Sequence, residues 1–421
     1  MMRCVSTERR EMYVHVGVPK TGTTFLQTVL WKAKRDLREE QGLTLPGRRS
    51  EDHVHAAQDL RGLHDAKQYS ARSHGGLERF EAALKNIRTP RALFTQELLA
   101  PSTYEQVDRF LGLFEDFDVH VIITARDLAR QIPSGWQQRV KRRVGTSYAD
   151  YLATVLDDPD MAYAFWRSQD IAEVARRWGK PLSPDRVHIV TLPPSGAPPG
   201  LLLERFCSVI GVDPERLDTD VARDNSSLSA PQAELMRRVN LALGDRLVHR
   251  QEGYNRLAKR YFAKGVLAQQ IGPAVKLPAR YAKRTRLLSA QMIAEIRDQG
   301  YDVVGDLADL EPTIFGESAG DAEQFDAVVT DATVADAGVE ALATVLAQRY
   351  EDLRRIDELR ARLRAAEDTW RRRNRRRLAA VKRDPARLLD KMPEGVRAAA
   401  PAGVRRRVRR RLEGRRGRRR G

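Results

Sequence analysis

Residues 19–24, which read Pro-Lys-Thr-Gly-Thr-Thr, are the stretch of this chain with the clearest capacity for chemistry. A β-rich run, 13–18, precedes them, and apolar residues at helical spacing follow, beginning with Phe25 and Leu26. This pattern predicts a strand, then a loop of the size that holds a phosphate, then a helix.

An anion is the ligand that such a loop would bind. The first N–H groups of a helix lack partners within the helix, and the helix dipole favours negative charge at that end. Lys20 adds a positive charge, and the threonines around Gly22 add hydroxyl donors: Thr21, Thr23 and Thr24. The lysine precedes the glycine, so the loop lacks the Walker A order. An ordinary strand–turn–helix with an exposed lysine is the alternative interpretation.

A second set of phosphate ligands is predicted at Arg126 and Ser134. Residues 118–124 form an almost continuous apolar run, which predicts a buried central strand. Arg126 stands at the carboxyl end of this strand, and Ser134 follows on the early turns of the next predicted helix. Arginine offers a planar fork of donors to a phosphate, and serine adds a hydroxyl. The basic run 139–143 is either a solvated helix face or an electropositive rim for an anionic ligand.

Two further side chains are candidates for proton transfer. Glu97 lies just beyond a predicted buried strand, 92–95, and ligands of doubly wound sheets bind at the carboxyl ends of strands. A carboxylate there could act as general base, and a glutamate at a helix N-terminus before Pro101 is the alternative. His55 follows a predicted second strand, 42–47, and is held in reserve as an active-site residue.

The histidines between residues 51 and 85 could suggest a metal centre. They are His53, His55, His64 and His74. No pair of them has the spacing of a metalloprotease helix or a zinc finger, and no cysteine lies nearby. We therefore predict exposed or capping histidines and no metal site.

The lysine loop and the spacing from Arg126 to Ser134 resemble the motifs of bacterial, actinobacterial-type sulfotransferases. These P-loop-like enzymes use 3′-phosphoadenosine 5′-phosphosulfate (PAPS) as sulfuryl donor. The resemblance covers roughly residues 11–316. It implies an α/β, P-loop-like three-layer fold with a central parallel sheet, and a reaction that needs no metal.

The resemblance also implies roles for individual residues. Residues 17–24 would be the phosphosulfate loop, with Lys20 as both a ligand and a catalytic charge. Arg126 and Ser134 would hold the 3′-phosphate, and Glu97 would be the catalytic base.

A third segment of the donor site is implied near residues 224–228. Asn225 and Ser226 would belong to a variable loop that closes over the nucleotide. Helix capping explains these two residues equally well.

The formal net charge of +17 is concentrated at one end of the chain. Residues 371–421 hold 22 Lys and Arg against 4 Asp and Glu, whereas residues 1–370 hold 52 against 53. The resemblance implies a sulfotransferase-like nucleotide-binding domain over 1–316. Composition and periodicity predict an acidic flexible linker over 317–335, an amphipathic or coiled-coil helix over 336–370, and a partly disordered Arg-rich tail over 371–421. The two cysteines, Cys4 and Cys207, imply no disulfide framework.

Location and partners follow from the same composition. The charged start of the chain does not resemble a signal peptide, so a cytoplasmic protein is expected, with the tail from 371 to 421 able to hold it at the inner membrane face or on a polyanion. The 336–370 helix suggests a homodimer. A small-molecule, carbohydrate or glycolipid acceptor fits the implied reaction. The alternatives are a P-loop kinase or NTPase, and a non-catalytic polyanion-binding protein that acts through the tail.

Overall fold

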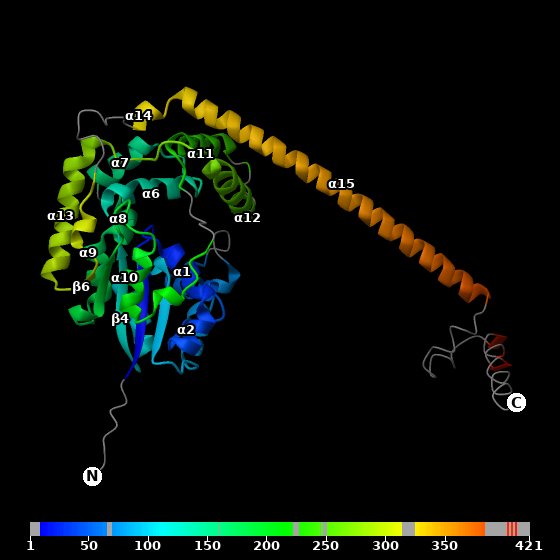
Figure 1. Ribbon diagram of the computed structural model, residues 1–421, viewed down its shortest axis with the longest axis horizontal. Coiled ribbons are helices and arrows are strands. Elements are labelled where there is room, and N and C mark those ends of the chain that lie inside the picture. Colours follow the sequence, from blue (N-terminus) through cyan, green and yellow to red (C-terminus); the bar gives the residue numbers. More distant parts are fainter. Residues whose placement is uncertain are drawn as a thin grey trace, which may run out of the picture. The chain divides into compact units, whose positions relative to one another are not determined.

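The protein is an α/β molecule built on one parallel sheet, as the sequence predicts (Figure 1). The computed structural model describes residues 9–64, 70–158, 160–221, 227–244, 246, 251–313, 325–383 and a few positions from 402 to 410. Within these ranges the sheet has six strands in the order β2-β3-β1-β4-β5-β6. The strands are β1 (Arg10–Gly17), β2 (Leu43–Thr44), β3 (Arg91–Thr95), β4 (Phe117–Ala125), β5 (Val187–Thr191) and β6 (Asp302–Val304).

The first strand lies at the centre of the sheet, between β3 and β4. Its side chains from Met12 to Gly17 are buried, as expected for a parallel strand covered on both faces. The connection after β1 leads to β2 at one edge of the sheet, whereas the connection after β4 leads to β5 in the opposite half of the sheet. The carboxyl ends of β1 and β4 therefore form the switch point at which ligands of open α/β sheets bind.

Helices follow most strands, as expected when parallel strands need crossover connections. The α-helices are α1 (Thr23–Lys32), α2 (Lys34–Glu40), α3 (Ser50–Leu60), α4 (Gly76–Leu84), α5 (Tyr104–Leu111), α6 (Leu128–Val140), α7 (Tyr148–Asp157), α8 (Tyr163–Gln169), α9 (Ile171–Gly179), α10 (Leu201–Ile210), α11 (Ala230–Leu243), α12 (Gln251–Tyr254), α13 (Ala282–Asp298), α14 (Phe325–Val328) and α15 (Asp331–Arg383). A π-helix, η6 (Asn255–Val266), continues α12, and short 3₁₀ turns include η1 (Ala71–Ser73), η2 (Glu97–Leu99), η3 (Gly112–Phe114) and η9 (Leu307–Leu310).

The helix that follows the lysine loop is interrupted and forms two helices, α1 and α2. Ala33 has φ −88° and ψ 7°, which ends the regular helix after Lys32. The chain resumes helical geometry at Lys34.

The two faces of the sheet are covered by different helices, which gives the predicted three layers. On one face, Leu26 of α1 and Phe206 of α10 belong to a buried cluster with Tyr13 of β1. On the other face, Phe94 of β3 packs its ring against Phe110 of α5, with ring centroids 5.0 Å apart. Figure 1 shows α6, α7 and α11 gathered at the end of the sheet where the strands finish.

The chain divides into two units, Met1–Ala341 and Leu342–Gly421. The helix α15 begins in the first unit, where Val334 and Ala341 are buried, and it continues to Arg383 in the second. Its start at Asp331 lies inside the segment predicted as a linker, and its end lies inside the segment predicted as a tail. No helix in the described ranges is long and apolar enough to cross a bilayer.

Candidate functional site

Three of the predicted residues meet at the carboxyl edge of the sheet because they follow adjacent strands. Lys20 follows β1, Glu97 follows β3 and Arg126 follows β4. The Arg126 guanidinium donates a hydrogen bond to the Lys20 carbonyl, with 3.2 Å from Nη1 to O. Glu97 packs against the end of β1 so closely that a Cβ at Gly17 would lie 3.0 Å from Glu97 Cβ. Strand order thus brings together residues that are far apart in the sequence.

The lysine loop has a tight backbone path. Lys20 has a φ of 75°, in the left-handed region that non-glycine residues rarely adopt. Gly22 has a φ of 83° and is the N-cap of α1. A Cβ at Gly22 would lie 2.5 Å from Cδ2 of Leu202 on α10. Glycine is therefore needed at position 22 for both its φ and its close packing.

The loop rests on a buried hydrogen-bond network. The Thr21 hydroxyl donates to the Val18 carbonyl at 2.6 Å and also contacts the Thr124 hydroxyl. The His15 ring belongs to the same network, with Nδ1 2.8 Å from Thr95 Oγ1 and Nε2 3.2 Å from Thr124 Oγ1. Burial lowers the pKa of His15 to about 3, so the ring is neutral. The Thr21 side chain therefore braces the loop from inside.

The start of α1 is open to an anion. Within the described part of the chain no side chain caps this helix, and its first turn holds no acidic residue. Thr23 is buried and Thr24 is half-buried in this first turn. Uncapped N–H groups at a helix N-terminus are suited to binding a phosphate or sulfate oxygen.

The helix α6 forms a second wall of the site. Gln131 Nε2 donates to the Pro19 carbonyl at 2.6 Å and so ties the beginning of α6 to the loop. Ser134 is half-buried one turn further along α6, on the same face as Gln131. Arg126 lies just before the start of this helix.

The basic run 139–143 contributes to the same region. Arg142 and Lys259 are the two cations that act most strongly on the charge of Lys20. Tyr254, the residue before the π-helix that carries Lys259, donates from its Oη to Asn240 Oδ1 of α11 at 2.7 Å. Asn240 in turn donates to the Val140 carbonyl at 2.8 Å. Arg142 and Arg139 are both exposed, and the charge of Arg142 on Lys20 favours the electropositive-rim interpretation for Arg142.

Lys20 and Arg126 are both held where their charged forms are disfavoured. Burial, followed by the charges of Arg142 and Lys259, lowers the pKa of Lys20 to about 8, and Glu97 opposes this shift. Burial lowers the pKa of Arg126 to about 10. Arg126 Nε is buried and has no hydrogen-bond partner among the described residues. A bound dianion would stabilise both charges and would supply the missing partner.

Proton uptake on anion binding is a direct consequence of the lowered Lys20 pKa. Free protein loses the Lys20 proton as the pH rises through about 8, whereas a bound anion raises the pKa and keeps the proton. We expect a sulfate anion to bind the loop with proton uptake near pH 8, and its affinity to fall above that pH. Calorimetry at pH 8 in buffers of different ionisation enthalpy measures the uptake. Equal binding enthalpies in all buffers, or equal uptake in Lys20→Met, would contradict this prediction.

Gln27 is a site residue that the sequence analysis did not find. Its Nε2 donates to Glu97 Oε2 at 2.9 Å, and so orients the carboxylate from α1. Gln27 lies one turn after Thr23 and on the same face of α1, and Thr23 is the first residue of this helix after the loop. The only signal in the sequence was a polar residue one turn into the helix that follows the loop. Gln27 and Gln131 could not be predicted as site residues, because each one binds a partner on a different element of the fold.

His55 lies among other charged groups. It is a half-buried residue of α3, and burial is the main cause that lowers its pKa. The charges that act on it are those of Asp52, Glu51, Arg79 and Arg72. Asn225 and Ser226 lie outside the described residues.

His53 is a core residue and is neither exposed nor a cap. Its Nε2 donates to the Pro46 carbonyl at 2.8 Å, and its Nδ1 accepts from the Thr95 N–H at 3.2 Å. The ring stacks on Phe94 with centroids 4.3 Å apart. Among the described residues no three His, Cys, Asp or Glu side chains are grouped as metal ligands.

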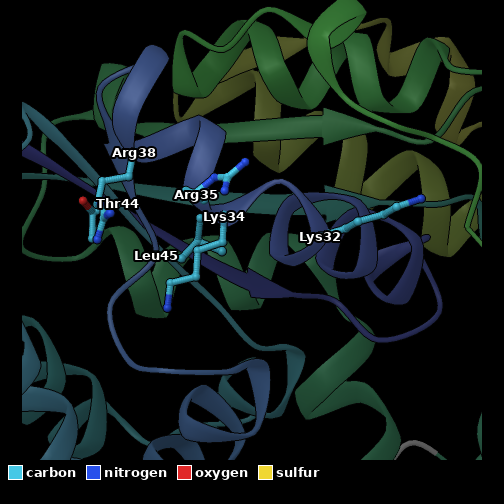
Figure 2. Close-up of a pocket in the computed structure, with 6 residues that line it drawn as sticks. All are labelled: Lys32, Lys34, Arg35, Arg38, Thr44 and Leu45. Atoms are coloured by element: carbon cyan, nitrogen blue, oxygen red, sulfur yellow. The ribbon is translucent and has the colours of Figure 1, made fainter.

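A cavity of about 380 Å³ lies beside the edge strand β2 (Figure 2). Its lining residues are Lys32, Lys34, Arg35, Arg38, Thr44 and Leu45. Figure 2 shows that Lys32 extends away from the other basic side chains, and Lys32 Nζ lies 2.6 Å from Asp218 Oδ2. The cavity shares no residue with the lysine loop or with Arg126, so we treat it as separate from the site.

Known proteins offer few comparisons. No protein-family model matches this chain, and no curated protein matches it. A solved structure, a sulfotransferase from Alicyclobacillus acidocaldarius, is similar with a TM-score of 0.34 and 16% sequence identity, over 59% of this chain and 99% of that chain. The function is therefore inferred from the side chains of this chain.

Proposed function

We propose that this protein is a PAPS-dependent sulfotransferase that moves a sulfuryl group to a hydroxyl or amine of a small-molecule, carbohydrate or glycolipid acceptor. The observation that carries the proposal is the pairing of Lys20 with Arg126. One cation sits on an anion-binding loop, and the other is hydrogen-bonded to that loop with a buried Nε that has no partner among the described residues. Two phosphate-binding positions this close together fit a nucleotide with phosphates at both the 5′ and 3′ positions.

The donor would occupy the site with its two charged ends on different elements. The first N–H groups of α1, Lys20 and the hydroxyls of Thr23 and Thr24 would hold the 5′-phosphosulfate. Arg126 and Ser134 would hold the 3′-phosphate, which distinguishes PAPS from 5′-adenylates.

The reaction would need little covalent chemistry from the protein. The acceptor oxygen forms a bond to sulfur while the bond from sulfur to the 5′-phosphate oxygen breaks, and adenosine 3′,5′-bisphosphate leaves. Glu97, held by Gln27, would accept the proton of the acceptor hydroxyl. Lys20 would neutralise the negative charge that develops on the departing phosphate.

Glu97→Gln is expected to lower turnover by about a hundredfold to ten-thousandfold, because the amide cannot accept the acceptor proton. Affinity for adenosine 3′,5′-bisphosphate should stay close to that of the unaltered protein. Transfer from radiolabelled PAPS to a panel of hydroxyl acceptors measures turnover, and calorimetry measures affinity. Glu105→Gln, at an exposed position on α5, is the matched control. Full turnover in Glu97→Gln would remove Glu97 from the mechanism.

Calorimetric titration of the full-length chain tests the proposed function itself. Adenosine 3′,5′-bisphosphate, 5′-AMP and Mg-ATP are compared at about 0.15 M salt, which screens weak binding by the basic tail. The proposal predicts tight binding of the bisphosphate alone. Equal binding of 5′-AMP would contradict it, and preferential binding of Mg-ATP would favour a kinase or NTPase. Binding that disappears with rising salt for all three ligands would favour a polyanion-binding protein.

A further inference from the structure

The exposed part of α15 carries an apolar stripe at heptad spacing. Leu342, Leu346, Leu353, Leu363 and Trp370 leave between 46% and 64% of their surface exposed. With Leu346 and Leu353 at heptad position a, the residues Leu342, Ile356, Leu363 and Trp370 all occur at position d. An a/d stripe that extends over more than three heptads is the pattern of a helix that pairs with another helix.

Three charged residues interrupt this stripe and determine which partner it fits. Arg349 occupies a d position, and Arg360 and Glu367 occupy a positions. A parallel, in-register pair would place each of these residues opposite the same residue of the second helix. Each of the three layers would then bring two like charges together, which is unfavourable.

We propose that α15 pairs with α15 of a second copy of this chain as an antiparallel coiled coil in which Arg349 faces Glu367 of the other copy. In an antiparallel pair, a positions face d positions. In this register the contact between Arg349 and Glu367 occurs twice, because the two helices are related by two-fold symmetry. The same register sets Leu346 opposite Trp370 and Leu353 opposite Leu363. Arg360 then faces Ile356, and its guanidinium is 3.5 Å from Asp357 on its own helix.

The charge distribution along α15 supports the antiparallel direction. Residues 331–357 hold six acidic and three basic side chains, whereas residues 358–383 hold three acidic and eleven basic ones. An antiparallel pair brings the acidic half of one helix alongside the basic half of the other. A parallel pair would bring the two arginine-rich halves together. If one helix shifted by one heptad relative to the other, Arg360 would face Arg349, and the contact between Arg349 and Glu367 would be lost.

Disulfide trapping in the full-length chain tests the orientation. Because Leu353 faces Leu363 only in the antiparallel register, the double variant Leu353→Cys/Leu363→Cys should form a covalent dimer on mild oxidation. The single variants Leu353→Cys and Leu363→Cys should stay uncrosslinked. All three variants also carry Cys4→Ser, and Cys207 is buried. Efficient crosslinking of the single variants would mean a parallel pair and would overturn the proposal.

Charge exchange tests the register independently of the cysteine variants. Arg349→Glu places two negative charges together and should raise the dimer dissociation constant by about tenfold or more. Adding Glu367→Arg to the same chain restores opposite charges and should return the constant to near its original value. Light scattering over a dilution series measures both. A monomer at every concentration, or no rescue by the second substitution, would contradict the proposal without bearing on the sulfotransferase site.

Discussion

Lys20→Ala is expected to lower sulfuryl transfer by about a hundredfold or more, the largest effect of any single substitution proposed for the donor site. Removing a preorganised charge from the position where negative charge develops typically costs about 3–4 kcal/mol of transition-state stabilisation. Lys20 is placed for this role by its left-handed backbone and by the bond from Arg126 to its carbonyl. The loss should appear mainly in turnover at saturating PAPS.

Two comparisons make the Lys20 result interpretable. Lys85→Ala removes an exposed lysine at the end of α4 and should leave turnover unchanged. Thermal unfolding of Lys20→Ala should show no loss of stability, since a buried lysine with a lowered pKa is held at a cost in the folded protein. Normal turnover in Lys20→Ala would rule out the proposed role of the loop. A large drop in melting temperature would show that the lysine is structural.

Arg126→Ala is expected to weaken binding of adenosine 3′,5′-bisphosphate by about tenfold to a hundredfold, the scale of one hydrogen bond to a charged group. Binding of 5′-AMP should change much less, because 5′-AMP has no 3′-phosphate for the guanidinium to contact. The ratio of the two affinities, measured by calorimetry, is therefore the informative quantity. Arg126→Ala should remove most of the preference for the bisphosphate.

Matched variants separate this specific role from general electrostatics. Arg109→Ala removes an exposed arginine on α5 and should leave both affinities unchanged. Arg126→Lys keeps the charge but loses the planar fork, so it should recover only part of the preference. If Arg126→Ala weakened both nucleotides equally, the guanidinium would be acting as a diffuse charge and the 3′-phosphate assignment would be wrong.

The sequence by itself was sufficient for features that depend on neighbouring residues. Hydrophobic periodicity predicted the buried strand at 118–124, and the structure has β4 there. The polar turn at 19–24 between a strand and a helix was also predictable, because apolar spacing and glycine position are local signals. The heptad spacing of 336–370 predicted a helix for the same reason, and α15 covers this range.

Only the tertiary structure decided which distant residues meet. The order β3-β1-β4 brings Glu97 and Arg126 to either side of the lysine loop, and local periodicity contains no information about strand order. Gln27 meets Glu97, and Gln131 meets the loop, through hydrogen bonds between elements that no spacing rule relates. His55, a candidate because it follows a predicted strand, lies on α3, and its role stays a prediction. The chemistry of single residues was therefore predictable from their types, whereas their assembly into a site depends on long-range pairing between strands and the helices packed on them.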